Sequence, residues 1–207
     1  MDLVSTGSAV AWLARILGLG RGGEHRVMEL AAAAPDAAWP AAASAPEPAA
    51  ASAPGPTAGD GTSAPADEPL FLPFLGRGEQ GALWDPDLRG TILGLDLSHG
   101  REHIARALVD GLVLESCRCF DVLTENGLPP APVRAAGAGA SSPFLRRQLA
   151  DASGRDVLAP ADPGRPFSAL GAALLACRAL GRAPEGPRAW TGPLERTASD
   201  PSRRSWW

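Results

Sequence analysis

The sequence feature that most constrains the fold is an alternation of short apolar runs and helix-forming stretches over Val133–Gly181. An apolar run beginning at Val133 is followed by a predicted helix over Pro143–Ala152. A second short strand is predicted at Asp156–Ala159, and a second helix at Phe167–Leu180. Strand–helix–strand–helix order is typical of a parallel α/β sheet with helical crossovers. The sequence therefore predicts an α/β fold around this segment.

The turn between the first strand and its helix is built from the small residues Gly137, Ala138 and Gly139. Ser142 suits the N-cap of the helix that follows, and Pro143 suits its first position. Small residues let a ligand approach the backbone, and a helix start offers unpaired N–H groups. The turn is thus either one wall of a nucleotide site or a ligand-free α/β turn. It lacks the spacing G-x-G-x-x-G, and it is not a Walker A loop because the chain contains no lysine.

Shorter elements are predicted upstream of this unit. Ser5–Leu17 has the apolar spacing of a short amphipathic helix, and Val27–Ala34 is a candidate for another. Leu70–Leu75 reads as a strand or buried extended segment, and Thr91–Leu95 is a further short apolar piece. We expect these elements to pack on the rest of the chain.

A long helix is predicted over Arg101–Asn126, with Ser98 as its N-cap. Its middle is apolar on nearly every side, so we expect it to be buried. Ala107 and Gly111 are small and four residues apart, which permits close packing against a neighbouring helix or strand.

Composition divides the 207 residues into four parts. Residues 1–34 form an N-terminal helical segment, and residues 70–182 form the predicted α/β core. Between them, residues 35–69 are mostly Ala, Pro, Gly and Ser, with only acidic charges. Such a stretch cannot bury enough apolar surface to offset its ordering entropy, so we expect a disordered insertion. Residues 183–207 are polar and proline-rich, and we expect a disordered tail.

Charge and cysteine content exclude several classes of function. The net charge of -4 gives no basic footprint for nucleic acid, and no apolar run is long enough to cross a membrane. Cys117 and Cys119 show neither a metal-ligand spacing nor a disulfide framework, so we expect free thiols and a reducing, cytoplasmic compartment. His99 and His103 lie at an i, i+4 spacing but lack a third ligand nearby. Surface or capping histidines are therefore expected there, and no metal site.

Several motifs resemble the FGGY carbohydrate kinases, the family of xylulokinase, gluconate kinase and glycerol kinase. Gly90–Asp110, which reads GTILGLDLSHGREHIARALVD, is similar to the second signature of that family. Leu72–Gly90 is similar to the xylulokinase-type loop, Val133–Asp151 to the adenosine motif, and Phe167–Ala176 to the closing helix. The resemblance also takes in residues 4–34. It implies a truncated C-terminal domain of the actin-like, ribonuclease-H-like ATPase type.

The resemblance also implies a reaction, the ATP-dependent phosphorylation of a sugar or polyol hydroxyl with ATP and Mg²⁺ as cofactors. Carried onto this chain, it places Gly137, Ala138, Gly139 and Ser142 on the adenosine side of the site. The family's middle glycine is Ala138 here. The sugar site and the aspartate general base belong to an N-terminal domain that this sequence lacks, so no catalytic residue is assigned.

Two hypotheses follow from the resemblance. The chain is the C-terminal, nucleotide-side part of a xylulokinase-like sugar kinase, inactive alone, with a separate FGGY N-terminal domain or subunit as its partner. Alternatively, it is a non-catalytic kinase remnant that acts as a binding or interaction protein. Asp85 and Asp110 are not expected to replace the missing base, because a turn and a helix give them structural roles.

Overall fold

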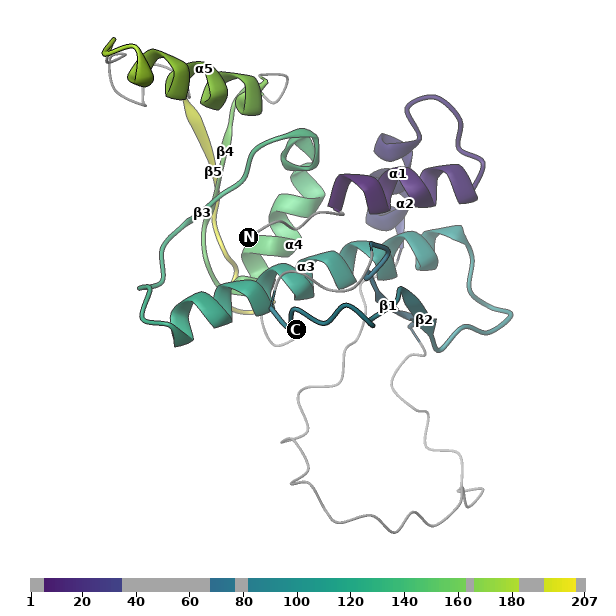
Figure 1. The fold of residues 1–207 in the computed structure, drawn as a ribbon. Helices are drawn as coiled ribbons and strands as arrows, with labels where there is room; N and C mark the ends of the chain where they lie inside the picture. The colour runs from purple at the N-terminus through teal and green to yellow at the C-terminus, as the bar shows by residue number, and fades with distance from the viewer. Residues whose placement is uncertain (1–5, 35–67, 77–81, 163–165, 183–191, 204–207) are drawn as a thin grey trace.

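The computed structural model describes residues 6–34, 68–76, 82–162, 166–182 and 192–203 (Figure 1). These residues form a mixed α/β structure with two small sheets and five α-helices. Most of residues 35–69, expected to be disordered, lie outside the described ranges. The same holds for residues 183–191 and 204–207 of the expected tail. Within the described ranges, no helix is both long enough and apolar enough to cross a membrane.

The apolar core lies among the first two helices, the first strand and the long helix α3. Helices α1 (Thr6–Ile16) and α2 (Gly23–Ala33) pack on α3 (Arg101–Glu125), which also contacts β1 (Leu70–Leu72). The buried apolar side chains of this core are Ala9, Val10, Leu13, Ala14, Val27, Met28, Ala31, Phe71, Ala105, Ala107, Leu108, Val109, Leu112 and Val113. Residues 6–34 therefore share one core with the predicted α/β unit.

The first sheet is an antiparallel pair of β1 and β2 (Thr91–Leu93). Phe71 pairs with Ile92 at its centre and turns its ring into the core, where it meets Trp12 edge-on at 6.0 Å. The predicted strand at residues 70–75 stops at Leu72, because Pro73 has no N–H for a sheet ladder.

The second sheet contains β3 (Val133–Arg134), β4 (Val157–Pro160) and β5 (Leu194–Thr197), in that order. Strands β3 and β4 are parallel and are joined through helix α4 (Pro143–Ser153), as the alternating pattern predicts. The expectation that residues 183–207 form a structureless tail is wrong for β5, which pairs antiparallel with β4. Three of its four residues are exposed, so its sequence lacks the apolar pattern of a buried strand.

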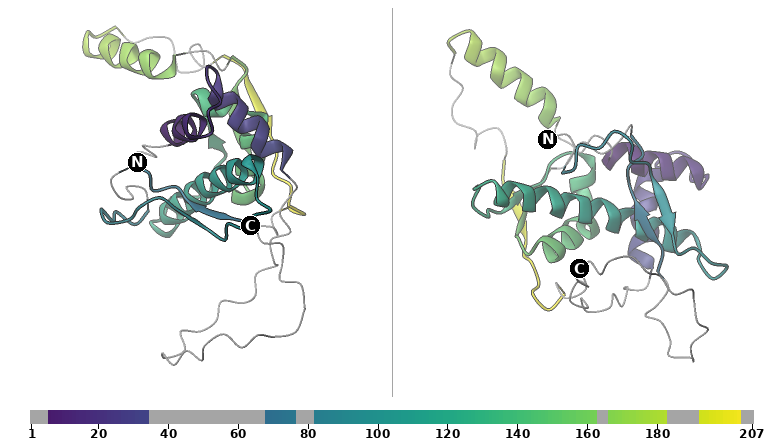
Figure 2. Two further views of the ribbon diagram at one scale, coloured as in Figure 1. Left: turned by 90° about the vertical axis from the view of Figure 1, so that its right-hand side faces the viewer. Right: turned by 60° about the horizontal axis from the view of Figure 1, so that its bottom comes forward.

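Residues beyond β5 are also fixed to the fold. The Asp200 N–H donates a 2.9 Å hydrogen bond to Oδ1 of Asp151, a fully buried carboxylate of α4. Oδ2 of Asp151 lies 3.1 Å from Nε of Arg203, an ion pair without hydrogen-bond geometry. The segment around residues 194–203 thus wraps along α4 (Figure 2).

Helix α5 (Phe167–Ala179) stands apart from the rest of the structure (Figures 1 and 2). None of its residues is buried, although its sequence is rich in Leu and Ala. Leu175 within the helix and Leu180 just after it are 71% and 72% exposed. The described residues therefore leave the apolar surface of this helix uncovered.

Candidate functional site

The predicted strand–turn–helix is present, and its turn contains a short 3-10 helix. After β3 the chain passes through Gly137, forms η1 (Ala138–Ser141) and enters α4. Gly137 has a φ of 90°, in the left-handed region where L side chains are strained. Hydrogen bonds from the Ala140 N–H to the Gly137 oxygen (3.0 Å) and from the Ser142 N–H to the Gly139 oxygen (3.2 Å) close the turn.

Ser142 caps α4, as predicted. Its Oγ accepts a hydrogen bond of 3.3 Å from the N–H of Leu145, and Pro143 occupies the first turn of the helix. This cap satisfies one of the N–H groups that a helix start leaves without an intrahelical partner. It also keeps the Ser142 hydroxyl at the mouth of the turn, with its own hydrogen left to donate.

The outer surface of the turn is open. Gly137 is exposed, and a Cβ built on it would meet no atom within 4 Å. A Cβ on Gly139 would meet Leu145 Cδ2 at an ordinary contact distance of 3.5 Å. The four predicted site residues lie together within six positions, and the side chain of Ala138 lies outside what the structure describes. The backbone here leaves room for a flat ligand to approach, which is what an adenosine group needs.

Arg146 hydrogen-bonds to the backbone of the turn, an interaction that local sequence patterns do not predict. Its Nη1 donates a hydrogen bond of 2.7 Å to the carbonyl oxygen of Ala140 in η1. Its Nη2 lies 3.3 Å from Oε2 of Glu195 on β5, 49 residues away in the sequence. Only the three-dimensional pairing of β5 with β4 brings this partner into reach.

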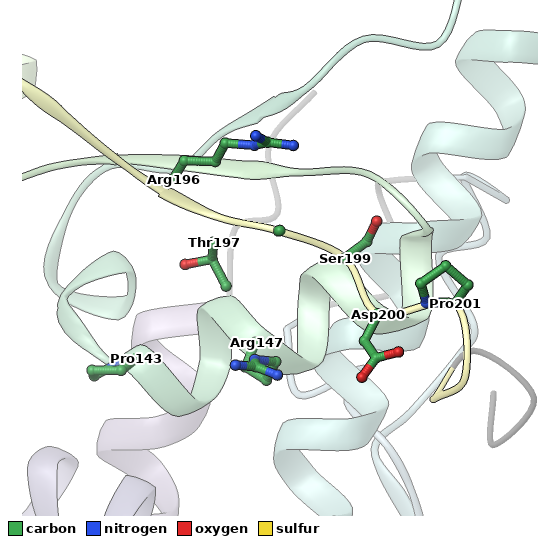
Figure 3. Close-up of a pocket in the computed structure, with 8 residues that line it drawn as sticks. Pro143, Arg147, Arg196, Thr197, Ser199, Asp200 and Pro201 are labelled. Atoms are coloured by element: carbon green, nitrogen blue, oxygen red, sulfur yellow. The ribbon is translucent and has the colours of Figure 1, made fainter.

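A shallow pocket of about 480 Å³ lies between α4 and the segment after β5 (Figure 3). Its lining residues are Pro143, Arg147, Arg196, Thr197, Ala198, Ser199, Asp200 and Pro201. The glycines of the turn do not line it. Arg196 is held by Asp156, with Nε and Nη2 each 2.7 Å from Oδ2. The Ser202 hydroxyl and N–H hold the pKa of Asp200 below its ordinary value.

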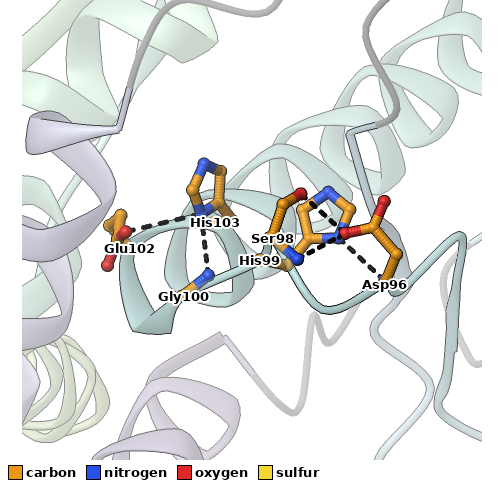
Figure 4. A network of polar contacts seen from close by, with 6 residues as sticks. All are labelled: Asp96, Ser98, His99, Gly100, Glu102 and His103. Atoms are coloured by element: carbon orange, nitrogen blue, oxygen red, sulfur yellow. Dashed lines mark hydrogen bonds and ion pairs between the residues drawn. The ribbon is translucent and has the colours of Figure 1, made fainter.

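Of the two neighbouring histidines, His103 caps helix α3 and His99 bonds to the loop before it (Figure 4). Nδ1 of His103 accepts the Gly100 N–H at 2.9 Å, so Gly100 is the N-cap of α3 and the prediction of Ser98 is wrong. Ser98 instead donates its hydroxyl and its N–H to Asp96, which lowers the pKa of that carboxyl. Nδ1 of His99 accepts the Asp96 N–H at 2.9 Å.

Both aspartates considered above are engaged by local partners. Asp85 Oδ1 accepts the Asp87 N–H at 2.8 Å, which is the turn role expected for it. Asp110 binds Nε of Arg106 through both carboxylate oxygens, at 3.0 and 2.8 Å. Among the described residues, no three His, Cys, Asp or Glu side chains gather as they would around a metal ion. Cys117, Cys119 and Cys177 are free thiols.

Comparison with known proteins gives a consistent result. The family model described as the FGGY family of carbohydrate kinases, C-terminal domain, matches residues 1–180. Gluconokinase from Bacillus licheniformis is 38% identical over 119 residues, which are 56% of this chain and 22% of that protein. Xylulose kinase from Escherichia coli (strain K12) is 38% identical over 112 residues, which are 53% of this chain and 22% of that protein.

Solved structures show the same fold. The xylulose kinase from Rhodospirillum rubrum superposes with a TM-score of 0.62 at 29% identity, covering 96% of this chain and 34% of that chain. The gluconate kinase from Lactobacillus acidophilus gives a TM-score of 0.65 at 20% identity, again over 96% of this chain and 35% of that one. The chain thus spans about a fifth of the curated relatives and about a third of the solved kinases.

Proposed function

Because the chain belongs to the FGGY family of carbohydrate kinases, we propose that it is the C-terminal, nucleotide-side portion of an ATP-dependent sugar kinase. The observation that carries this proposal is the open turn at residues 137–142, between a parallel strand and a capped helix, inside the region that the family model matches. The reaction is transfer of the terminal phosphoryl group of ATP to a hydroxyl of a sugar or polyol.

In this proposal the turn forms one wall of the adenosine site. The exposed backbone of Gly137 and the half-exposed backbone of Gly139 receive the flat face of the nucleoside. Ser142 offers its hydroxyl hydrogen while its oxygen stays engaged in the helix cap. The open space around Gly137 fits this role, because a side chain there would occupy the approach.

The described residues do not offer a magnesium site. No cluster of three ligating side chains is present among them, so no step of the reaction is assigned to a metal held by this part of the chain. Phosphoryl transfer in kinases uses Mg²⁺ between the phosphates and a carboxylate that takes the proton of the acceptor hydroxyl. We propose that the rest of the kinase supplies both groups.

It follows that this chain alone does not phosphorylate sugars. General-base catalysis contributes about 10²–10⁴-fold, and positioning of two substrates contributes about 7–11 kcal/mol. Among the residues that the structure describes, neither contribution has a candidate group beside the turn. Domain closure, which excludes water from the reacting groups, also needs a second domain.

The uncovered surfaces of the structure support a protein partner that carries the remaining kinase segments. Helix α5 has no buried residue, and in the described residues β3 pairs only through its β4 side. An unpaired strand edge is a ready template for pairing with another strand, so the open side of β3 can accept one. A separate FGGY N-terminal portion would cover α5 and extend the sheet beyond β3.

Nucleotide binding tests the first part of the proposal. The chain is titrated with ADP and with ATP while backbone amide shifts are followed by NMR. We expect shifts centred on Gly137–Ser142 and an affinity in the millimolar range, since most phosphate contacts are missing. Shifts confined to segments distant from this turn would contradict the site.

Activity with and without a partner tests the second part. ATP turnover is assayed with D-xylulose, L-ribulose, gluconate and glycerol, first with the chain alone and then with a separately expressed FGGY N-terminal portion. We expect turnover only in the mixture, together with loss of solvent exposure at α5. Turnover by the chain alone would overturn its assignment as an inactive portion. Binding without turnover in the mixture would favour the non-catalytic alternative.

The sugar is proposed from the named relatives. The chain resembles gluconokinase and xylulose kinase at equal identity, and glycerol kinases at slightly lower identity. We propose a xylulokinase-like acceptor, a ketose or related polyol, on the basis of the loop over Leu72–Gly90. The same assay ranks the acceptors, and a preference for gluconate or glycerol would replace this assignment.

A further inference from the structure

One arginine joins the candidate nucleotide turn to the C-terminal strand. Arg146 donates from Nη1 to the Ala140 carbonyl oxygen at 2.7 Å, and its Nη2 lies 3.3 Å from Oε2 of Glu195 on β5. Its side chain is 13% exposed, whereas that of Glu195 is 57% exposed. The guanidinium therefore lies largely buried between the turn and the strand, and the carboxylate meets it from the solvent side.

The chemistry of this position favours arginine. A guanidinium presents donors in a rigid planar fork, so it can bond a carbonyl and a carboxylate at once, which an ammonium does less well. Arg146 lies in the first turn of α4, and helical side chains lean toward the helix N-terminus. Its guanidinium is thereby directed back over η1. Ala140 is buried, so its carbonyl oxygen needs a partner within the protein.

We propose that Arg146 is a positioning residue for nucleotide binding, oriented by Glu195. It holds the Ala140 peptide, and with it the turn over Gly137–Ser142, in the conformation that receives the adenosine group. This inference rests on the proposed nucleotide site. It makes β5 part of the architecture of that site, although β5 lies beyond residues 1–180, the region matched by the family model.

The geometry separates this role from ordinary core packing. The turn has two backbone hydrogen bonds of its own, at 3.0 and 3.2 Å, and the left-handed Gly137 at its entrance. These are local restraints within six residues. The Arg146 bond ties the same turn to a strand 49 residues further along. Loosening that tie should alter the turn before it alters the apolar core around α3.

Amide hydrogen exchange tests the tie without any nucleotide. In Arg146→Gln we expect the Ala140 and Ser142 amides to exchange about tenfold faster, equivalent to about 1.4 kcal/mol in local opening. The matched control is Arg147→Gln, which makes the same charge change one residue along the same helix. It should leave both rates unchanged. Unchanged rates in Arg146→Gln, or equal acceleration in both variants, would overturn the inference.

The role of Glu195 is tested by Glu195→Gln. Because Glu195 is exposed, this variant should keep the fold. If Arg146→Gln does not fold, Glu195→Gln alone tests whether Arg146 and Glu195 hold the turn. We expect a smaller acceleration of the same two amides. The double variant should exchange no faster than Arg146→Gln, since both changes break one link. Fully additive effects, or no effect of Glu195→Gln, would overturn the link to β5.

Nucleotide affinity distinguishes positioning from mere stability. At a temperature far below melting, Arg146→Gln should raise the Kd for ADP about tenfold, and Arg147→Gln should not. A lower melting temperature with an unchanged Kd would show a purely structural role and overturn the inference. If the unaltered chain binds no ADP, the proposed nucleotide site fails. The exchange rates at Ala140 and Ser142 still test whether Arg146 and Glu195 hold the turn.

Discussion

The backbone of Gly111 in α3 faces the carbonyl oxygen of Phe71 in β1 so closely that a Cβ atom on Gly111 would overlap it. The sequence predicts a close approach at this helix, because Ala107 and Gly111 are small and four residues apart. The structure identifies the partner as a strand. Phe71 also places its ring in the core, so this contact fixes β1 on α3.

Substitution of Gly111 by alanine should therefore destabilise the fold. The added methyl must displace the backbone of β1, and overpacking of this kind costs about 1–3 kcal/mol. Urea unfolding followed by circular dichroism measures the change. The matched control is Gly171→Ala in α5, where a Cβ would meet nothing within 4 Å. That variant should gain about 0.5–1 kcal/mol in helix propensity. Equal stability of the two variants would contradict the packing described here.

Removal of the buried carboxylate of Asp151 should release the segment that follows β5. Asp151→Ala loses the hydrogen bond from the Asp200 N–H and the ion pair with Arg203, and bonds to a charged group contribute about 1.5–3 kcal/mol. Limited proteolysis should then cleave near residues 198–203 first. Asp151→Asn keeps one acceptor and should show a smaller effect. Asp121→Ala, an exposed change on α3, serves as control.

The turn at Asp200 should respond to pH only in the acid range. Hydrogen bonds from the Ser202 hydroxyl and N–H lower the pKa of Asp200 below its ordinary value of 3.8. A depressed pKa contributes stability that is present above the unfolded value and is lost as the pH falls through the folded one. The turn should therefore remain intact from neutral pH down to about pH 4.

The cause of that depressed pKa is tested by Ser202→Ala. Loss of the hydroxyl should move the pKa of Asp200 up toward 3.8, as followed by the carboxyl carbon signal in NMR. Ser98→Ala is a matched control, because the Ser98 hydroxyl lowers the pKa of Asp96 in the same way. Each substitution should move only its own aspartate. A pKa of Asp200 that stays low in Ser202→Ala would exclude the hydroxyl as its cause.

Replacement of Ser142 should affect both the helix and the proposed ligand. Ser142→Ala removes the cap of α4, which costs about 1 kcal/mol, and removes the hydroxyl offered to the nucleotide. Ser142→Asn keeps a capping oxygen and loses only the hydroxyl. We expect ADP to bind more weakly to both variants, and α4 to be destabilised only in Ser142→Ala. Ser168→Ala, at an exposed position in the first turn of α5, should change neither property.

The features that could be predicted from the sequence are those set by neighbouring residues. Ser142 and Pro143 predict the start of α4, and the helix ends before Gly154, whose backbone is left-handed. The long helix was predicted over 101–126 and is found over Arg101–Glu125. In each case the deciding interactions span no more than a few positions, so local patterns contain them.

The features that could not be predicted depend on partners far along the chain. Strand β5 has a mostly exposed, charged sequence, and it is placed by its pairing with β4 and by the ion pairs that Glu195 and Arg196 make with distant residues. The bond network of Arg146 exists because that pairing carries Glu195 to α4. The first residue of α3 agrees with the prediction, but its N-cap is Gly100 and not Ser98. The side chain of His103 accepts a hydrogen bond from the Gly100 N–H. The helix therefore begins after Gly100, although serine is the residue that N-cap preferences favour.

Helix α3 contacts α1, α2 and β1 as well as α4, so it joins the N-terminal helices and first sheet to the part formed by α4 and the second sheet (Figure 1). Both parts lose buried contacts if this helix unfolds. We therefore expect cooperative unfolding, in which signals from the two sheets disappear together in one transition. A substitution that weakens the pairing of β1 and β2 would then also lower the folded fraction of the turn at residues 137–142, although the two regions need not touch. Substitutions in the buried turns of α3 should therefore affect all of the elements that pack on this helix.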